Sequence, residues 1–407
     1  MGTGGTEVRA RATPPVEASA ARRWSILAAS TLAQAAAAIT IHGPAFLIPT
    51  LHDRLGLSLA QAGAVAAAPT VGVMLALVAW GALADRAGER LVLLAGLGAT
   101  AVAGGLALLA ADGSPVLLGA ALAVAGAAAA STSSASGRVV VGWFPPHRRG
   151  LAMGIRQMAQ PVGVGVAAVS IAATAQDAGL RAALLIPAVA AAAATVLVAA
   201  TVLDPPRTPG AHAEGVNPYR ADGFLARVHG VSVLLVVPQF LVWTFALVWL
   251  VQERDWSPGA AGALVGAAQV AGALGRIAAG QLSDVVASRL RPLRWVSIAA
   301  ALTMALLGLA AGLDAAVAVP LVVVATVVTV ADNGLAFTAV AERAGAGWSG
   351  RALGVQNTAQ FLAASCVPPL AGLAVEGVGY AATFAVAALF PLVAVPLVPV
   401  REERTLS

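Results

Sequence analysis

Three ionisable side chains stand deep inside long apolar stretches of this sequence, where charges are rare and usually functional. Asp332 lies ten residues before Glu342, which is about 15 Å along a helix at ~1.5 Å per residue. Arg156 and Arg276 lie about 10 and 12 Å from the nearest charged helix ends on the same scale. Such arginines can hold an anion and such an aspartate can take up a proton, because a charge in hydrocarbon must be paired, hydrated or neutralised. Two alternatives stay open: the arginines snorkel to the membrane surface, and Asp332 hydrogen-bonds to Asn333.

Amide, imidazole and indole groups in other apolar stretches extend this candidate site. Arg156 and Gln160 are four residues apart, as are Gln356 and Gln360. Each pair therefore shares one helix face, and the two faces can line one cavity. His42 is the only histidine that we place inside an apolar span, and a histidine there can carry a proton. Hydrogen bonds that simply hold helices together account for these groups equally well. The cavity candidates are His42, Arg156, Gln160, Trp243, Arg276, Asp332, Gln356 and Gln360.

The sequence repeats itself at half its length of 407 residues. The pattern Gly-x-Leu-x-Asp occurs at 81–85 and again at 280–284, an offset of 199 residues. A second pair of similar segments begins at Gly150 and Gly350, an offset of 200 residues. Two related apolar halves are typical of membrane transporters whose pathway lies between the halves.

The composition excludes a soluble protein of this size. Hydrophobic residues make up 59% and charged residues 11% of the chain, whereas soluble domains carry about 25% charged residues. The net charge of +5 does not indicate nucleic-acid binding, because the arginines sit at segment ends and form no patch. Cys366 is the only cysteine, which excludes an intramolecular disulfide and a cysteine-based metal cluster. All basic residues are arginine and alanines are many, which indicates a GC-rich genome and a bacterial origin.

Twelve apolar runs are each long enough to cross a hydrocarbon core about 30 Å thick. We predict spans at 24–50, 59–84, 91–111, 115–142, 149–173, 180–203, 229–251, 258–283, 292–312, 315–341, 351–375 and 379–400. The expected fold class is an all-α membrane protein with two pseudo-symmetric six-helix bundles. The bundles occupy 24–203 and 229–400, and the polar segments are a tail at 1–23, a linker at 204–228 and a tail at 401–407.

The arginines outside the spans predict the orientation in the membrane. Eighteen of them fall on the side of both termini and the linker, and only Arg54, Arg181 and Arg254 fall on the other side. Positive charge concentrates on the cytoplasmic side of membrane proteins. We therefore expect a multi-pass protein of the bacterial plasma (inner) membrane, with both termini in the cytoplasm and an uncleaved N-terminal tail.

The first copy of the repeated pattern resembles the signature loop between the second and third spans of the major facilitator superfamily. It reads Gly-Ala-Leu-Ala-Asp-Arg-Ala-Gly-Glu-Arg at 81–90, between the second and third predicted spans. The second copy keeps the Gly, Leu and Asp but lacks the Arg and Gly that should follow. The motif residues are Gly81, Asp85, Arg86, Gly88 and Arg90 in the first copy and Gly280 and Asp284 in the second. The resemblance implies a fold of six plus six helices and secondary active transport by alternating access, with no cofactor and no enzymatic activity.

The motif is expected to act as a latch between the two halves. Asp85 lies at a predicted cytoplasmic helix end, where its carboxylate can pair with an arginine or face the positive end of a helix in the other half. Gly81 allows close helix approach, and Gly88 permits a tight turn. Such a contact favours the state closed to the cytoplasm. The alternative is a plain turn whose charges only fix the topology. Arg138 is expected to snorkel or to pair with Asp85.

We expect proton-linked movement of a small organic or inorganic anion, because three arginines and only one acid, Asp332, lie within the spans. The alternative is a proton-coupled exporter of a neutral or cationic drug-like compound. Leu122 stands where many proton-coupled members carry an arginine, and 160–165 lacks the exporters' Gly-Pro pattern, so both departures disfavour the alternative. The run 149–157 resembles the small-anion carriers, including the cyanate-permease branch. The expected partners are a small-molecule substrate, a proton and the lipid bilayer, for a monomer that binds no metal or nucleic acid.

Overall fold

The computed structural model describes residues 19–205 and 217–403. Every regular element in these two stretches is a helix, and neither stretch contains a strand, which confirms the predicted fold class. The predicted tails at 1–23 and 401–407 and the linker at 204–228 lie partly outside the described residues. The same holds for four of the eighteen arginines that predict the orientation, namely Arg9, Arg11, Arg207 and Arg404.

The first bundle contains six membrane-spanning segments, each long and apolar enough to cross a bilayer. They are α1 with η1 and α2 (Ala20–His42, Gly43–Leu47, Ile48–Leu55), α3 (Leu59–Ala87), α4 (Glu89–Ala110), α5 (Pro115–Trp143), α6 with α7 (Pro146–Gln157, Ala159–Ala178) and α8 (Leu180–Thr201). Two of these spans are irregular. The first tightens to a 3-10 helix after His42, where Pro44 follows, and the fifth is interrupted at Met158.

The second bundle repeats this arrangement after a short helix, α9 (Pro218–Ala221). Its elements are α10 (Phe224–Glu253), α11 (Pro258–Val285), α12 (Leu290–Gly312), α13 with α14 (Ala318–Val328, Asp332–Ala344), α15 (Ser349–Ala387), α16 (Leu389–Leu397) and η2 (Val400–Glu402). The 54-residue stretch Ser349–Glu402 is long enough for two spans. Gly379 separates them, because its φ of 80° interrupts the helix in a conformation that glycine adopts without strain.

The observed helix boundaries differ from the predicted ones by a few residues. α10 begins at Phe224, before the predicted start at 229. His229, the first residue of the predicted span, therefore lies inside α10 and its candidate span, so the prediction that His42 is the only histidine inside a span is wrong. Helix starts coincide with capping residues where the sequence offers them: Ser58 and Gln61 form reciprocal bonds at the start of α3, which satisfies two otherwise free backbone N–H groups.

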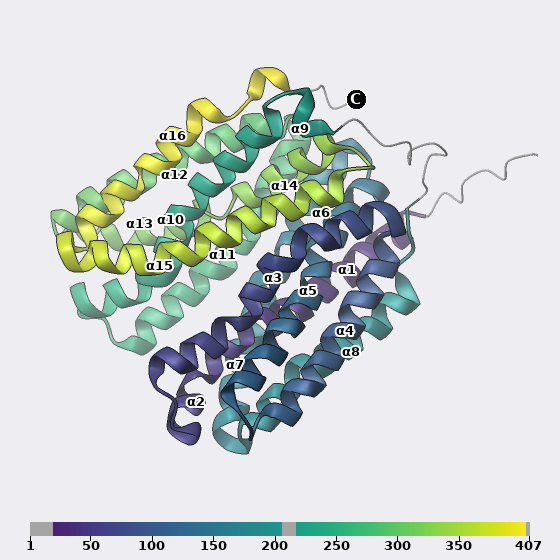
Figure 1. The fold of residues 1–407 in the computed structure, drawn as a ribbon. Helices are drawn as coiled ribbons and strands as arrows, with labels where there is room; N and C mark the ends of the chain where they lie inside the picture. Colours follow the sequence, from purple (N-terminus) through teal and green to yellow (C-terminus); the bar gives the residue numbers. More distant parts are fainter. Residues whose placement is uncertain (1–18, 206–216, 404–407) are drawn as a thin grey trace, which may run out of the picture.

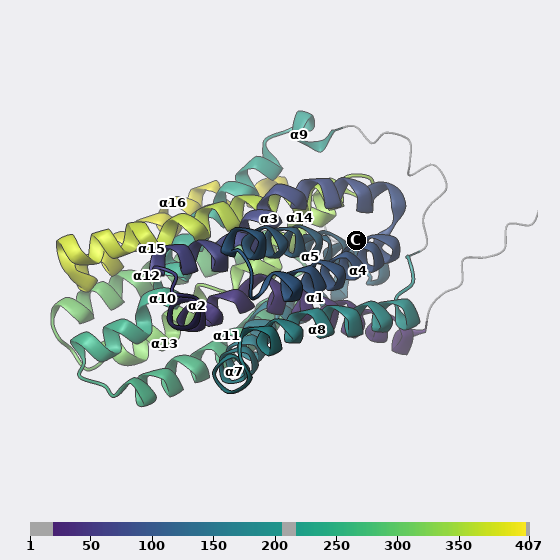
Figure 2. The ribbon, with the colours of Figure 1, turned by 60° about the horizontal axis from the view of Figure 1, so that its bottom comes forward.

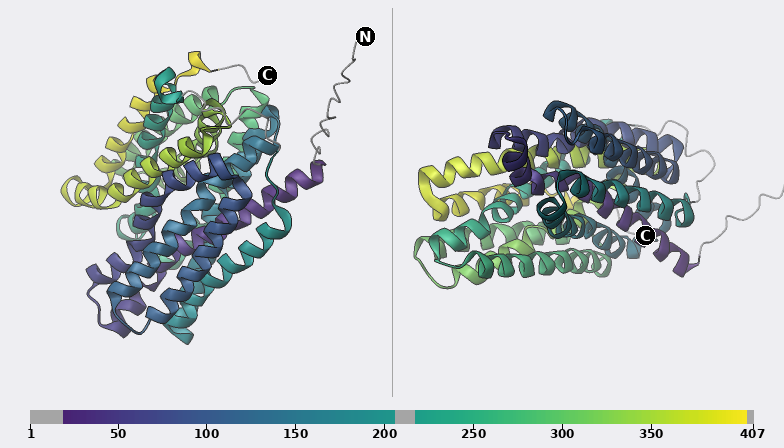
Figure 3. Two further views of the ribbon diagram at one scale, coloured as in Figure 1. Left: turned by 45° about the vertical axis from the view of Figure 1, so that its right-hand side comes forward. Right: turned by 90° about the horizontal axis from the view of Figure 1, so that it is seen from below.

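The two bundles lie side by side with their helices along a common direction (Figures 1 and 2). The described chain ends lie at one end of the molecule, which we call the Asp85 end, and the α4–α5 loop with Asp112 lies at the other, the Asp112 end (Figures 1 and 3). The bundles diverge toward the Asp112 end in both figures. Arg181 pairs with Asp112 there at 2.7 Å.

Glycines bring the bundles into backbone contact at the Asp85 end. A Cβ on Gly81 in α3 would collide with the backbone of Gly350 in α15, and a Cβ on Gly150 in α6 would collide with the backbone of Gly280 in α11. Small residues allow such approach between membrane helices. The segment at 81–85 therefore contacts the segment that begins at Gly350, and the segment at 280–284 contacts the one that begins at Gly150.

Candidate functional site

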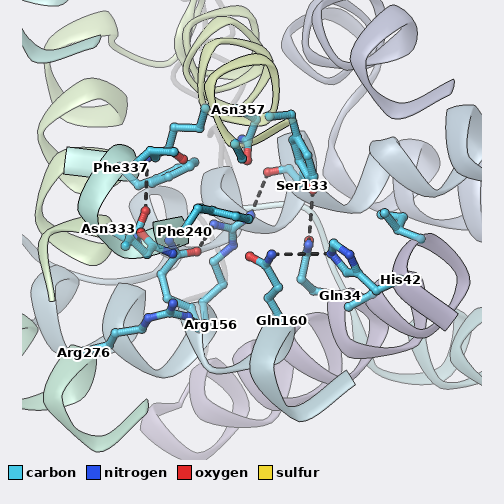
Figure 4. Close-up of a pocket in the computed structure, with 18 residues that line it drawn as sticks. Gln34, His42, Ser133, Arg156, Gln160, Phe240, Arg276, Asn333, Phe337 and Asn357 are labelled. Atoms are coloured by element: carbon cyan, nitrogen blue, oxygen red, sulfur yellow. Dashed lines mark hydrogen bonds between the residues drawn. The ribbon is translucent and has the colours of Figure 1, made fainter. Parts of the chain in front are cut away.

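A polar cavity lies between the two bundles and draws side chains from α1, α5, α6 and α7 of the first and α10, α11, α14 and α15 of the second (Figure 4). Its free volume is about 60 Å³, and one water needs about 10–15 Å³ of such space, so roughly four to six waters fit. Its polar lining consists of Gln34, His42, Ser133, Arg156, Gln157, Gln160, Gln239, Arg276, Asn333, Asn357 and Gln360. None of these described residues is a carboxylate, so the cavity is cationic and rich in amides.

The lining follows the internal repeat of the sequence. Three matched pairs line the cavity at an offset of 200 residues, namely Ser133 with Asn333, Gln157 with Asn357 and Gln160 with Gln360. Corresponding helices of the two halves therefore present corresponding side chains to one space. A site at the interface of two repeats is the arrangement found in transporters with duplicated halves.

Arg156 is held by the first bundle and faces the second. Its Nε donates to Ser136 Oγ at 2.9 Å, its Nη2 to the Ser133 carbonyl at 2.8 Å and its Nη1 to Gln157 Oε1 at 2.6 Å. Its guanidinium carbon lies 5.5 Å from the ring centre of Phe337, a cation–π distance. Because these contacts fix the guanidinium inside the protein, with 2% of the residue exposed, Arg156 does not snorkel to the membrane surface.

Arg276 reaches the same place from the second bundle. Its Nη1 donates to the backbone carbonyl of Gln157 at 2.8 Å, so both arginines contact Gln157. Its Nε is buried and has no hydrogen-bond partner among the described residues. Within the same residues, the ion pairs at the Asp85 end and on the surface involve neither Arg156 nor Arg276. Two guanidinium groups from opposite halves therefore converge without a neutralising carboxylate in contact.

Asp332 begins α14 beside the cavity but is not part of its lining. It is 1% exposed, and no other side chain in the described stretches donates to either carboxylate oxygen. The side chain of Asn333 does not donate to it and donates instead to Gln239 Oε1 at 3.1 Å. A hydrogen bond between the Asp332 and Asn333 side chains, which the sequence left open, is therefore absent from the structure. The carboxyl group interacts electrostatically with Arg276.

Three amides of the second bundle form a chain along one wall of the cavity. Gln360 Nε2 donates to Asn333 Oδ1 at 3.1 Å, and Asn333 Nδ2 donates to Gln239 Oε1 at 3.1 Å. On the opposite wall, the Nε2 atoms of His42 and Gln160 lie 3.5 Å apart (Figure 4). The wall amides are therefore oriented by one another, and each chain leaves polar atoms free at its ends.

Five of the eight cavity candidates line the cavity, namely His42, Arg156, Gln160, Arg276 and Gln360. Asp332, Gln356 and Trp243 do not, which corrects the predicted lining. Gln356 is completely buried behind the cavity, where it contacts His229 and bonds to Ser232. Trp243 lies on a separate, mostly apolar pocket of about 440 Å³ between α7, α10 and α11. Asn357 lines the cavity in place of its neighbour Gln356, and Gln157 lines it in addition to Arg156 and Gln160.

Several lining residues were not distinguished by spacing, including Gln34, Ser133 and Asn333. A polar side chain in an apolar span is the only sequence signal they carry, and it does not separate cavity residues from residues that join helices. Gln34 shows both roles, because it lines the cavity and its Nε2 donates to Ser133 Oγ at 3.2 Å.

His229 joins the end of the interhalf linker to the second bundle. Its Nδ1 contacts Gln356 Oε1, and its Nε2 lies 2.9 Å from the Tyr219 hydroxyl in α9. Burial raises the pKa of Tyr219 to about 12, so the hydroxyl keeps its proton at neutral pH and can donate it to a hydrogen bond. α9 is thereby attached to α10 and, through Gln356, to α15.

Asp85 contacts the opposite bundle at the start of α15. Its carboxylate accepts hydrogen bonds from the backbone N–H groups of Gly350 at 2.8 Å and Arg351 at 3.1 Å. These lie in the first turn of the helix, where N–H groups are free and the helix dipole is positive. Arg138 bridges the same interface, because it pairs with Asp85 and donates to the carbonyl of Ala346 at 2.7 Å. The predicted alternatives of pairing with an arginine and facing a helix end both occur.

Asp284 makes the corresponding contact in the reverse direction. It accepts hydrogen bonds from the backbone N–H groups of Gly150 at 2.9 Å and Leu151 at 2.8 Å in α6. Arg289 pairs with it at 2.6 Å and also donates to the carbonyl of Pro146 in the first bundle. Arg289 therefore has the place beside Asp284 that Arg138 has beside Asp85.

The remaining residues of the first motif shape the loop. Gly88 has a φ of 102°, in the region that favours glycine, and it ends α3. Arg90 stays within its own bundle, where its side chain donates to the carbonyl of Ala199 at 2.8 Å and its N–H to Asp204 at 2.8 Å. Arg86 is exposed. Asp85 and Gly81 make the interhalf contacts of this motif that are described above.

The described residues form twelve apolar spans in two related bundles, with Ser349–Glu402 counted as two, and a polar cavity lies between the bundles. This arrangement defines a membrane transport protein. Residues 28–368 match the family model described as Major Facilitator Superfamily, so the chain belongs to that family of transporters. Over 382 residues it is 44% identical to an "Uncharacterized MFS-type transporter" of Mycobacterium tuberculosis strain H37Rv, which covers 93% of this chain and 85% of the relative. The bacterial relative agrees with the origin expected from the composition.

Solved structures of transporters share the fold. The Escherichia coli fucose:proton symporter FucP superposes with a TM-score of 0.75 at 14% identity, covering 93% of this chain and 98% of that chain. The proton:xylose symporter XylE gives 0.73 at 17% identity, covering 95% and 98%, and the human organic anion transporter MFSD10 gives 0.67 at 16%, covering 92% and 99%. At these identities the likeness shows the fold alone.

Proposed function

We propose that this chain is a proton-linked secondary transporter of a small organic or inorganic anion. The observation that carries the proposal is the convergence of Arg156 and Arg276, one from each bundle, on Gln157 in a cavity without a lining carboxylate. A charge at the centre of a membrane costs at least ~2.5–3.5 kcal/mol on insertion scales. An anionic ligand offsets that cost for two cations at once. Because the ligand would touch both halves, its binding would be coupled to their relative movement.

The size of the cavity supports a small substrate. Its free volume of about 60 Å³ holds roughly four to six waters. A drug-sized ligand needs a pocket of about 300–1,000 Å³. An anion of a few non-hydrogen atoms therefore fits the cavity as it stands, whereas a larger ligand needs the walls to move apart.

Asp332 is the proposed proton carrier. Its carboxyl group is buried and accepts no hydrogen bond from another side chain of the described residues, so it is placed to take up a proton. Arg276 interacts with Asp332 and also contacts the cavity, so an anion at Arg276 and a negative charge on Asp332 compete for the same cation. Anion binding would therefore favour protonation of Asp332. This linkage is the step that would couple anion flux to a proton gradient.

The Asp85 end is the proposed cytoplasmic end, on the basis of the arginine asymmetry. The Asp85 and Asp284 contacts would then hold the halves together on the cytoplasmic side, in a state closed to the cytoplasm. Rocking of the bundles would break both latches and expose the cavity to the cytoplasm.

The test is uptake of anions into proteoliposomes against an imposed pH gradient. Arg156→Gln and Arg276→Gln should each abolish anion binding, since each removes one cation from the cavity. Asp332→Asn should bind the anion but no longer accumulate it against a gradient. Arg181→Gln is the matched control, because Arg181 is an exposed residue whose ion pair with Asp112 lies at the protein surface. Normal uptake by both cavity variants would refute the anion assignment.

Export of a neutral or cationic drug-like compound is the second candidate. The apolar pocket of about 440 Å³ beside Trp243 favours it, because that volume lies in the range of drug-sized ligands. Trp243→Ala would weaken export of such a compound and leave anion uptake intact. If Arg156→Gln loses anion uptake while cells that produce this variant keep their wild-type drug sensitivity, anion transport is favoured over drug export.

A further inference from the structure

We infer that the substrate of the central cavity is a small hydroxylated anion, one that carries neutral O–H donors beside its negative charge. This inference rests on the proposed anion transport and narrows it to one chemical class. It follows from the hydrogen-bonding atoms that the cavity leaves unused. A simple anion offers acceptors only, so it can satisfy the donors of the cavity but none of its acceptors.

The wall formed by α10, α14 and α15 leaves one donor and one acceptor free. In the chain from Gln360 through Asn333 to Gln239, the unused atoms are Gln360 Oε1 and Gln239 Nε2, which have no partner among the described residues. The count does not depend on how the amides are turned. If all three were reversed, the free atoms would be Gln360 Nε2 and Gln239 Oε1, again one donor and one acceptor.

Other amides of the cavity add more acceptors. Asn357 uses its Nδ2 to bond the carbonyl of Leu353 at 2.8 Å, which leaves its Oδ1 free among the described residues. Gln160 uses its Nε2 toward His42, which leaves its Oε1 free in the same sense. Gln157 Oε1 is taken by Arg156, which leaves an N–H group free. A ligand that fills the cavity therefore meets carbonyl oxygens on both walls as well as cationic donors.

The donors of the ligand should be hydroxyls and not ammonium groups. An ammonium would also satisfy carbonyl oxygens, but it would sit beside Arg156 and Arg276 with no lining carboxylate to compensate it. A hydroxyl donates and accepts without adding charge. Waters can serve the free acceptors when the cavity is empty, and a hydroxylated ligand replaces them without leaving buried polar atoms unpaired.

Three ligands with the same three-carbon skeleton test the inference directly. Propionate, lactate and alanine place a hydrogen, a hydroxyl and an ammonium at the same carbon, and glycerate adds a second hydroxyl. Binding to the purified full-length protein is measured by calorimetry. We expect lactate to bind about fivefold to 150-fold more tightly than propionate, because an unpaired buried acceptor costs that much in affinity. Glycerate should bind at least as tightly as lactate, and alanine should not bind.

Variants locate the preference in the cavity. Gln160→Met and Gln360→Met keep the side-chain length and remove the acceptor, so the ratio of lactate to propionate affinity should fall toward one in at least one of them. Gln176→Met is the matched control, because Gln176 is an exposed residue further along α7, the helix that carries Gln160. The control should keep the wild-type ratio, and thermal unfolding of each variant verifies that it is folded.

The outcomes separate the inference from the function on which it rests. If anions bind but propionate equals lactate, or affinity rises along the series from propionate to hexanoate, the hydroxylated class is wrong while anion transport stands. Equal binding of alanine and lactate would also overturn it. If no anion binds the wild type, both the inference and the proposed function fail.

Discussion

Replacement of Asp85 by asparagine is the sharpest test of how the Asp85 end is held closed. The substitution keeps the side-chain shape and removes the charge. In the structure the Asp85 carboxylate serves four partners: the N–H groups of Gly350 at 2.8 Å and Arg351 at 3.1 Å, the Arg351 side chain at 3.2 Å, and Arg138. An asparagine offers one acceptor oxygen, and its NH₂ group would face donors.

The expected magnitude follows from these contacts. A hydrogen bond to a charged group contributes about 1.5–3 kcal/mol, and a carboxylate at a helix N-terminus contributes up to ~2 kcal/mol in partly buried geometry. Arg138 keeps its ion pair with Glu89 at 2.7 Å, so the variant avoids the ~3–5 kcal/mol cost of an orphaned buried charge. We therefore expect the closed state to lose about 2–3 kcal/mol, which shifts the equilibrium between closed and open states roughly 30-fold to 150-fold.

The assay measures access to the interhalf contact from the Asp85 end. Leu353 in α15 is completely buried against the first bundle. The exposed native cysteine, Cys366, is first replaced by serine so that it does not react. A cysteine at 353 is then labelled with a membrane-impermeant maleimide in vesicles of known orientation. Asp85→Asn should raise the labelling rate by the same 30-fold to 150-fold and slow transport, with a near-normal yield of folded protein. Asp112→Asn, at the exposed surface pair, is the control. Unchanged labelling and transport would reduce Asp85 to a marker of topology.

Three further expectations rest on other features. Ala at Gly350 would place a Cβ against Gly81 and the Asp85 carboxylate, so Gly350→Ala should separate the bundles and lower the unfolding temperature, as thermal denaturation would show. Tyr219→Phe should cost about 1 kcal/mol through the lost bond to His229. Burial raises the pKa of Tyr219 from 10.0 to about 12, so its contribution to stability should persist below pH 10 and disappear between pH 10 and 12. The free energy of unfolding of Tyr219→Phe should not show this fall between pH 10 and 12. Reporter fusions after residue 112 should read external and fusions after residue 346 internal, and the reverse result would contradict the assigned orientation.

Hydropathy and the repeat were sufficient to predict the fold, because a bilayer forces each apolar run of about 20 residues into a helix that satisfies its own backbone. The resemblance of the motif to the family's signature loop predicted that Asp85 pairs with an arginine or faces a helix end of the opposite half, and both contacts occur. The helix boundaries were less certain, because residues near a membrane surface carry mixed polarity. The predicted span began at His229 for this reason, whereas α10 begins five residues earlier, at Phe224.

The cavity lining was predicted only in part, because spacing defines a helix face but not the direction in which that face points. On α15 the lining residues are Asn357, Gln360, Phe361 and Ala364, which form one stripe at helical spacing. Gln356 shares a face with Gln360 by the four-residue rule, yet it lies one position outside this stripe, a rotation of about 100° from Asn357. The packing of α15 against α10, where His229 contacts Gln356, determines that Asn357 and not Gln356 lines the cavity together with Gln360.

The two ends of the pseudo-symmetric latch use the same charges in reversed order along the chain. In the first half Glu89 begins α4 and pairs with Arg138. In the second half Arg289, at an offset of 200 residues, stands beside the start of α12 and lies 3.3 Å from Glu342.

Each arginine does three things: it pairs with an acid of its own half, it pairs with the latch aspartate, and it donates to a backbone carbonyl of the opposite half. The sign is exchanged between the halves only at Glu89 and Arg289, but the set of contacts is kept. Both latches therefore have a guanidinium beside the latch carboxylate, although the arginine that supplies it comes from different positions in the two halves. For this reason we propose that Asp284 gates the transporter as Asp85 does, even though its motif is incomplete in sequence.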